Sequence, residues 1–137
     1  MNRNDDLYLA DSSKSVAQFA ADFEAVCKKY DFTVNNTDTM DMAKTFSAHG
    51  ADVTADFDLH MIQVCKPSKA SKSLSGNPER SILMPKFVMA FSKDGKTQIR
   101  YMSYSAADIS EMIDDEVFPA ALAETFAKIR SMIDEAK

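Results

Sequence analysis

The stretch KFVMAFSKDGKTQIRYMSY, Lys86–Tyr104, holds two β-prone runs joined by an Asp-Gly pair. Asp-Gly between such runs is the strongest short-range signal for a β-hairpin, because both central residues of the tight turn take positive φ angles. We therefore predict two adjacent antiparallel strands with Asp94 and Gly95 at the turn. This hairpin makes an antiparallel sheet the framework for the rest of the chain.

Two segments with helical periodicity lie before and after the hairpin. Apolar side chains recur every three or four residues in 11–31 and in 118–133, which is typical of amphipathic helices. Ser12 or Ser13 is placed to cap the first helix, and Pro119 falls in the first turn of the second, where proline is tolerated.

Shorter segments complete the expected elements. A helix over residues 38–50 would begin after Asp38 or Thr39 and end before Gly50. Further strands are predicted at residues 7–10, 32–36 and 57–64, and a short helix at 109–113. This order predicts an α+β fold in two layers, an antiparallel sheet with two long helices packed on one face, in a single domain over residues 1–137.

The predicted strand at residues 57–64 changes phase along its length. Apolar and polar residues alternate up to Met61, and the apolar positions then shift to Ile62 and Val64. This pattern predicts either a β-bulge or a strand covered on both faces. His60 lies on the face opposite Met61, and we expect it to be a surface or cross-strand histidine.

Composition and charge exclude several classes of function. The chain has 137 residues, 45% of them hydrophobic, and a net charge of −5, which argues against nucleic-acid binding. No apolar run approaches the ~18 residues of a membrane helix. The start lacks a signal-peptide pattern, so we expect a cytoplasmic protein without a membrane partner, although a signal removed beforehand would leave no trace.

The cysteines, glycines and methionines limit the chemistry further. Cys27 and Cys65 are expected to be free thiols, Cys27 on the apolar stripe of the first helix, and neither belongs to a spaced metal-ligand pair. Three glycines cannot build a glycine-rich phosphate loop. The nine scattered methionines indicate core or cavity lining. No metal site is predicted, and no pattern identifies a cofactor.

The connection VCKPSKASKSLSGNPERSILMP, residues 64–85, is the candidate functional surface. It begins a basic region, because residues 64–100 carry eight Lys or Arg against two acids in an otherwise acidic chain. Apolar spacing after a first-turn proline predicts a short helix over residues 67–75, ended by Gly76, with Leu74 in the core.

Cationic side chains, hydroxyls and backbone amides gather at the start of this helix, an arrangement that suits a phosphate or carboxylate. Cys65 is the candidate catalytic residue, because Lys66 and the helix N-terminus would favour its thiolate; the alternative is a small packed residue at the strand end. The candidate ligand- or anion-binding residues are Cys65, Lys66, Ser68, Lys69, Lys72 and Lys86.

The chain over roughly residues 7–135, which includes the connection and the hairpin, resembles the domain-of-unknown-function family 302. The matching positions are Cys65 and Pro67, then Ala70 and Leu74, then Met84 and Pro85. Lys66 stands where the family usually has asparagine and Lys86 where it usually has a second cysteine, so a two-thiol redox or metal pair would lack one partner. The resemblance implies a TATA-box-binding-protein-like β-α-β(4)-α fold and a homodimer, and no biochemical activity.

Two hypotheses about function follow. The first, which we favour, is a non-enzymatic module that binds a small anionic or apolar ligand, or a partner, with residues 65–86 as its rim. The second is a thiol-dependent enzyme or redox sensor centred on Cys65, which requires a thiol more reactive than a free model thiol at neutral pH. Nucleic-acid binding rests on analogy of fold alone, and the acidic net charge argues against it.

Overall fold

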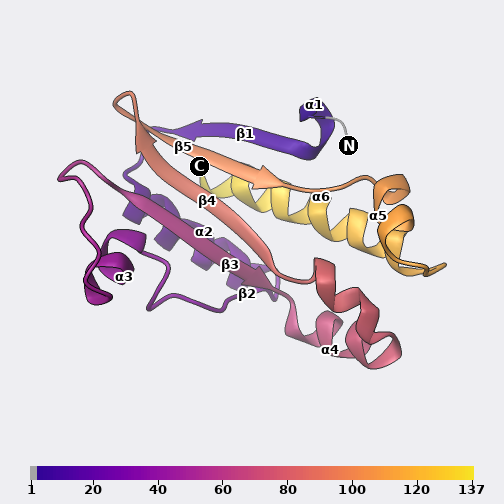
Figure 1. Ribbon diagram of the computed structural model, residues 1–137. Coiled ribbons are helices and arrows are strands. Elements are labelled where there is room, and N and C mark those ends of the chain that lie inside the picture. Colours follow the sequence, from indigo (N-terminus) through magenta and orange to yellow (C-terminus); the bar gives the residue numbers. More distant parts are fainter. Residues whose placement is uncertain (1–2) are drawn as a thin grey trace.

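The computed structural model describes residues 3–137 (Figure 1). The strands are β1 (Leu7–Ser12), β2 (Thr33–Val34), β3 (Leu59–Cys65), β4 (Lys86–Lys93) and β5 (Lys96–Met102). The helices are α1 (Arg3–Asp6), α2 (Val16–Lys29), α3 (Met42–Ala48), α4 (Pro67–Gly76), the 3-10 helix η1 (Pro78–Leu83), α5 (Ala106–Met112) and α6 (Phe118–Ala136). Among these, no helix has both the length and the apolar character needed to cross a bilayer.

The five strands form one antiparallel sheet in the order β1-β5-β4-β3-β2. The long helices α2 and α6 both pack on one face of this sheet, while α4 and η1 lie beyond the ends of β3 and β4 (Figure 1). Because α2 connects β1 at one edge of the sheet to β2 at the other, the first third of the chain provides both edge strands, and the β4–β5 hairpin lies between β1 and β3. This arrangement confirms the predicted α+β fold class.

The hairpin between β4 and β5 is as predicted. Asp94 and Gly95 have φ angles of 54° and 75°, the positive values that a two-residue hairpin turn needs, and Lys93 pairs with Lys96 across it. The register continues without interruption to Val88 and Tyr101. The two strands at the centre of the sheet are therefore placed by a local sequence signal.

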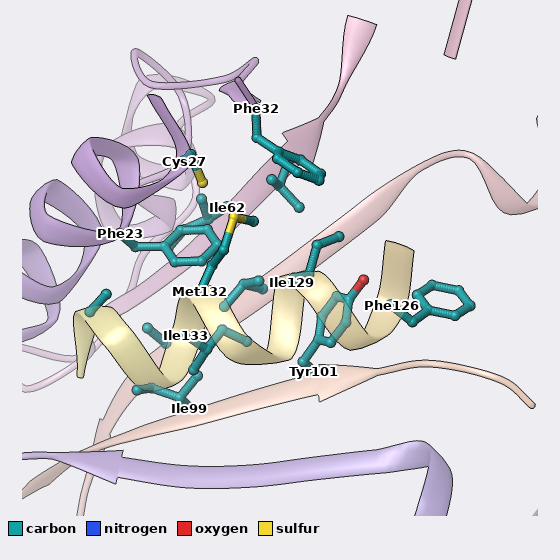
Figure 2. Close-up of a cluster of buried hydrophobic side chains, with 14 of the residues drawn as sticks. Phe23, Cys27, Phe32, Ile62, Ile99, Tyr101, Phe126, Ile129, Met132 and Ile133 are labelled. Atoms are coloured by element: carbon teal, nitrogen blue, oxygen red, sulfur yellow. The ribbon is translucent and has the colours of Figure 1, made fainter. Parts of the chain in front are cut away.

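The hydrophobic core lies between the sheet and the two long helices. Figure 2 shows side chains from α2, β3, β5 and α6 meeting in one cluster, with Phe23, Ile62 and Ile129 among them. Each fully buried aliphatic or aromatic side chain of this kind contributes about 1.5–3 kcal/mol of transfer free energy. Cys27 is fully buried in this cluster, which confirms its predicted core position.

Strand β3 is regular, which corrects two expectations. Its register with β4 runs unbroken from Leu59 opposite Phe91 to Val64 opposite Lys86, so of the two predicted alternatives, a bulge or a strand covered on both faces, the bulge is absent. His60 is 6% exposed and shares the core-facing side with Val64, so the expectation of a surface histidine was wrong; its cross-strand neighbour is Ala90. Ile62 and Val64, where the apolar positions shift, lie on the fully buried face of the strand, and the residues of the opposite face are half-buried.

Two helices begin later than expected. The cap of α2 is Ser15, because β1 extends through Ser12, whose hydroxyl instead accepts from the Lys14 amide. The cap of α3 is Asp41, whose carboxylate accepts from two amides of the first turn, and Gly50 follows the helix with φ 77° as expected.

The predicted helix after β3 is present as α4, one residue longer than expected. Leu74, however, is half-buried, and α4 contains no fully buried residue. The expectation of a core position for Leu74 was therefore wrong, because α4 lies beside the end of the sheet rather than over its centre.

Candidate functional site

A small pocket lies where β3 ends and β4 begins, between α4 and the first half of α6. Its volume is about 40 Å³. Phe118 and Leu122, both buried residues of α6, provide much of its apolar wall. The lining residues are Cys65, Lys66, Lys69, Ala70, Ser73, Met84, Lys86, Phe118, Ala121, Leu122 and Thr125.

Lys86 is the most buried charged residue of this pocket. It is the first residue of β4, directly opposite Val64, and only 9% of it is exposed. Its ammonium group donates to the Met84 carbonyl oxygen over 3.1 Å. Burial lowers the Lys86 pKa from its ordinary value; repulsion from Lys69 adds to this effect, and attraction to Cys65 opposes it.

Lys69 reaches the pocket from α4 and is held by α6. Its Nζ donates to Thr125 Oγ1 over 3.0 Å, and the Thr125 hydroxyl in turn donates to the Ala121 carbonyl over 3.2 Å. Thr125 is itself buried. This chain of hydrogen bonds fixes the Lys69 ammonium group at the wall that α6 provides.

Lys66, the residue before α4, completes the group of cations. Its ammonium group lies 5.1 Å from the centre of the Phe32 ring, within range of a cation–π contact. Within residues 3–137, no carboxylate lies within 4 Å of the ammonium groups of Lys66, Lys69 or Lys86. Three positive charges therefore border one small apolar pocket without an acidic partner from the described chain.

Cys65 contributes a thiol to the same pocket. It is the last residue of β3 and is half-buried, and its carbonyl accepts from the Thr33 hydroxyl over 3.3 Å. Cys27 differs sharply, because burial in the core raises its pKa to about 12. Of the two cysteines, only Cys65 is placed to meet a ligand.

Arg80 links the segments that form the outer end of the pocket. Its Nε donates to Asp115 over 2.6 Å, and its Nη1 donates to the Ser73 carbonyl over 3.1 Å. Its guanidinium group also lies 5.4 Å from the centre of the Phe118 ring. One arginine of η1 thus joins α4, the loop before α6 and the first residue of α6.

Asp115 is the acceptor at the centre of that linkage. One of its oxygens accepts from Arg80 and Asn77, and the other accepts from the amides of Val117 and Phe118 at the start of α6. These hydrogen bonds, chiefly the one from Arg80, hold the Asp115 pKa well below its usual range.

Four of the six predicted binding residues meet at this pocket: Cys65, Lys66, Lys69 and Lys86. Ser68 and Lys72 are exposed on α4 and do not line it. The basic region is thus divided, because other members lie elsewhere; Lys93 and Lys96 flank the hairpin turn, and Arg100 lies over the Phe91 ring on β4.

Sequence reasoning missed the wall that α6 contributes. Phe118, Leu122 and Thr125 lie on the apolar stripe of that helix, and the stripe alone indicated only a core-facing side. Two features of the sequence could have indicated a gap with a polar lining beside this helix. Ala121 has a small side chain, and Thr125 places a hydroxyl among apolar residues. Ser73 carried no comparable signal.

Comparison with known proteins identifies relatives without an assigned activity. The family model described as "Domain of unknown function DUF302" matches residues 8–136. A solved structure of an uncharacterized conserved DUF302 protein from Bacillus stearothermophilus superposes with a TM-score of 0.76, covering 96% of this chain and 98% of that chain. Its sequence is 18% identical, so the likeness concerns the fold. No curated protein matched.

Proposed function

This chain belongs to the DUF302 family, a domain of unknown function, and we propose that its pocket binds a small organic anion without catalysing a reaction. The observation that carries this proposal is the burial of Lys86 without a carboxylate partner. A buried charge is costly unless it is paired. A bound carboxylate or phosphate group would supply the missing negative charge.

The surrounding groups favour an anion that also has a short apolar part. Lys69, held in place by Thr125, offers a second charge-assisted hydrogen bond near Lys86. Phe118 and Leu122 offer apolar contact on the α6 side. At about 40 Å³ the pocket selects for ligands of a few heavy atoms.

Calorimetric titration of the full chain with acetate, propionate and inorganic phosphate, at matched ionic strength, tests this proposal. We expect saturable binding that is lost in Lys86→Met and in the double variant Lys66→Ala, Lys69→Ala. Lys72→Met is the control, because Lys72 is exposed on α4, the helix that carries Lys69, and does not line the pocket. Unchanged binding in the Lys86 and double variants, or no binding of any of these anions, would contradict the proposal.

A thiol-dependent function is the second candidate, and the position of Cys65 near the positive charge of Lys86 favours it. Cys65 lines the same pocket as Lys86, whose positive charge attracts a thiolate there. The test is the rate at which a disulfide reagent labels Cys65 at neutral pH, compared with a free model thiol. A faster rate that falls in Lys86→Met supports thiol chemistry, whereas a rate no faster than the model thiol removes it. Cys27 serves as the internal control, because it is buried in the core.

A homodimer is a further proposal, supported by the sheet face opposite the helices. This face carries polar side chains such as Arg100 beside an apolar group that is incompletely covered. Leu9 is 49% exposed and Met102 is 44% exposed, and Met61, Phe87 and Met89 are half-buried. A second copy could cover such a patch. Light scattering after gel filtration should report two subunits, and one subunit in Met102→Lys. A monomeric parent chain would overturn this proposal.

A further inference from the structure

We infer that Lys86 captures the carbonyl group of a small oxo acid as an imine within this pocket. The inference rests on the proposed function, because the anionic group of the ligand is what brings its carbonyl carbon to the lysine. The ligand class is a carbonyl compound that also carries a carboxylate, of the size of glyoxylate or pyruvate. The outcome is reversible covalent binding, which needs no turnover.

The position of Lys86 provides the first requirement, an amine held at the pocket wall and shielded from water. Its backbone is fixed by the β3–β4 ladder opposite Val64, and the residue as a whole is 9% exposed. The Met84 carbonyl accepts one of its N–H groups over 3.1 Å, which fixes the end of the side chain. Exposed lysines such as Lys72 have no such support.

The second requirement is a neutral amine, since only the free base attacks a carbonyl carbon. Burial lowers the pKa of Lys86, so a larger share of its side chain is neutral near pH 7 than for an exposed lysine. The charged groups that act on it come from β3 and α4: Lys69 lowers the pKa further, and Cys65 raises it. The α6 wall contributes the neutral Thr125.

The third requirement is a site for the carboxylate. Lys69 is placed for this role, because its Nζ is held 3.0 Å from Thr125 Oγ1 and has no acidic partner in residues 3–137. A carboxylate bound there would be joined to the ligand's carbonyl carbon by one bond in a 2-oxo acid. A 2-oxo acid of this kind has few heavy atoms, as a pocket of about 40 Å³ requires.

The reaction balances without an oxidant or reductant. The lone pair of neutral Lys86 Nζ adds to the carbonyl carbon, and the carbonyl oxygen takes up a proton to give a carbinolamine. The nitrogen then loses a proton, and the hydroxyl takes up a second proton and leaves as water while the nitrogen lone pair forms the C=N bond. The protonated imine loses its remaining N–H proton, so the two protons that nitrogen loses balance the two in the released water. Hydrolysis reverses the same steps and frees the ligand.

Reductive trapping tests the inference. The full chain is incubated near neutral pH with pyruvate or glyoxylate and sodium cyanoborohydride, then digested and mapped by mass spectrometry. We expect one dominant reduced adduct, on Lys86, which is lost in Lys86→Met and retained in Lys72→Met. Circular dichroism of each variant verifies that it is folded. Adducts spread over the exposed lysines, or an unmodified Lys86, would overturn the inference.

Two further measurements separate this inference from the proposed function. Acetate, which has no reactive carbonyl, reports anion binding alone; if acetate binds and no adduct forms at Lys86, carbonyl capture is overturned and the anion site stands. If acetate does not bind and no adduct forms, both proposals fail. Acetone, which has a carbonyl and no anionic group, should be trapped at Lys86 less than pyruvate is. Equal trapping of the two would overturn the assignment to oxo acids.

Discussion

Arg80 donates to Asp115 over 2.6 Å, and this pair joins the connection between β3 and β4 to the start of α6. The Asp115 side chain is 5% exposed and also accepts from the first amides of that helix. Since α4 and α6 form opposite walls of the pocket, the pair fixes the distance between the residues that each wall presents. The positions of the lysines around the pocket therefore depend on an ion pair that contacts none of them.

Stability should fall in acid through the protonation of Asp115. Its folded pKa is depressed, chiefly by Arg80, below the value of about 3.9 that an unfolded aspartate has. The stabilisation is therefore complete above about pH 5 and is lost as the pH falls through 3.9 toward the folded pKa. Urea unfolding between pH 7 and pH 3 measures it. Asp115→Asn and Arg80→Met should both flatten this dependence, and an unchanged slope in both would show that another carboxyl group is responsible.

Lys86→Met should stabilise the fold while it removes ligand binding. Methionine has a similar length and carries no charge, so we expect a gain of about 1 kcal/mol or more at pH 7, since an unpaired buried charge is removed. The gain should shrink at alkaline pH. Because the folded pKa of Lys86 lies below its unfolded value, the parent chain recovers stability as the pH rises toward about 10.4. Chemical unfolding at pH 7 and pH 10 tests this, and a destabilised variant at pH 7 would contradict it.

Two leucines near the pocket should respond very differently to truncation. Leu122 is buried on α6, and Leu122→Ala should cost about 2–5 kcal/mol. Leu74 is half-buried on α4, and Leu74→Ala should cost less than about 1 kcal/mol. Denaturant unfolding of both variants provides the comparison. Equal losses would show that α4 is packed as tightly as α6.

Tyr101→Phe should be neutral or stabilising by about 1 kcal/mol. The ring of Tyr101 packs edge-on against Phe126 in the core, but its hydroxyl is buried without a hydrogen-bond partner among the described residues. The variant keeps the ring and removes the unsatisfied group. Tyr30→Phe is the matched control and should destabilise, because the Tyr30 hydroxyl donates to Glu135 over 2.6 Å. A loss in Tyr101→Phe as large as in the control would reveal a hidden partner for the hydroxyl.

Local features were predictable from the sequence because their causes lie within a few residues. The Asp94-Gly95 turn needs positive φ at two adjacent positions, and the stripes of α2 and α6 follow from a period of 3.6 residues. Cys65 was predicted as a candidate on similar grounds, as the residue between a strand and a short helix. Periodicity identifies which side of an element is apolar, and it carries no information about what covers that side.

The candidate site depended on tertiary structure for that reason. His60 and Leu74 were misplaced because burial is decided by the elements that pack above a residue, and α4 lies beside the end of the sheet. The sequence by itself determined the hairpin, the two long helices and the cationic connection. Only the folded chain decided that Lys86 is buried and that Lys69, which lines the same pocket, meets Thr125 on α6, because contacts between residues so distant in sequence form when the whole sheet and both helices are in place.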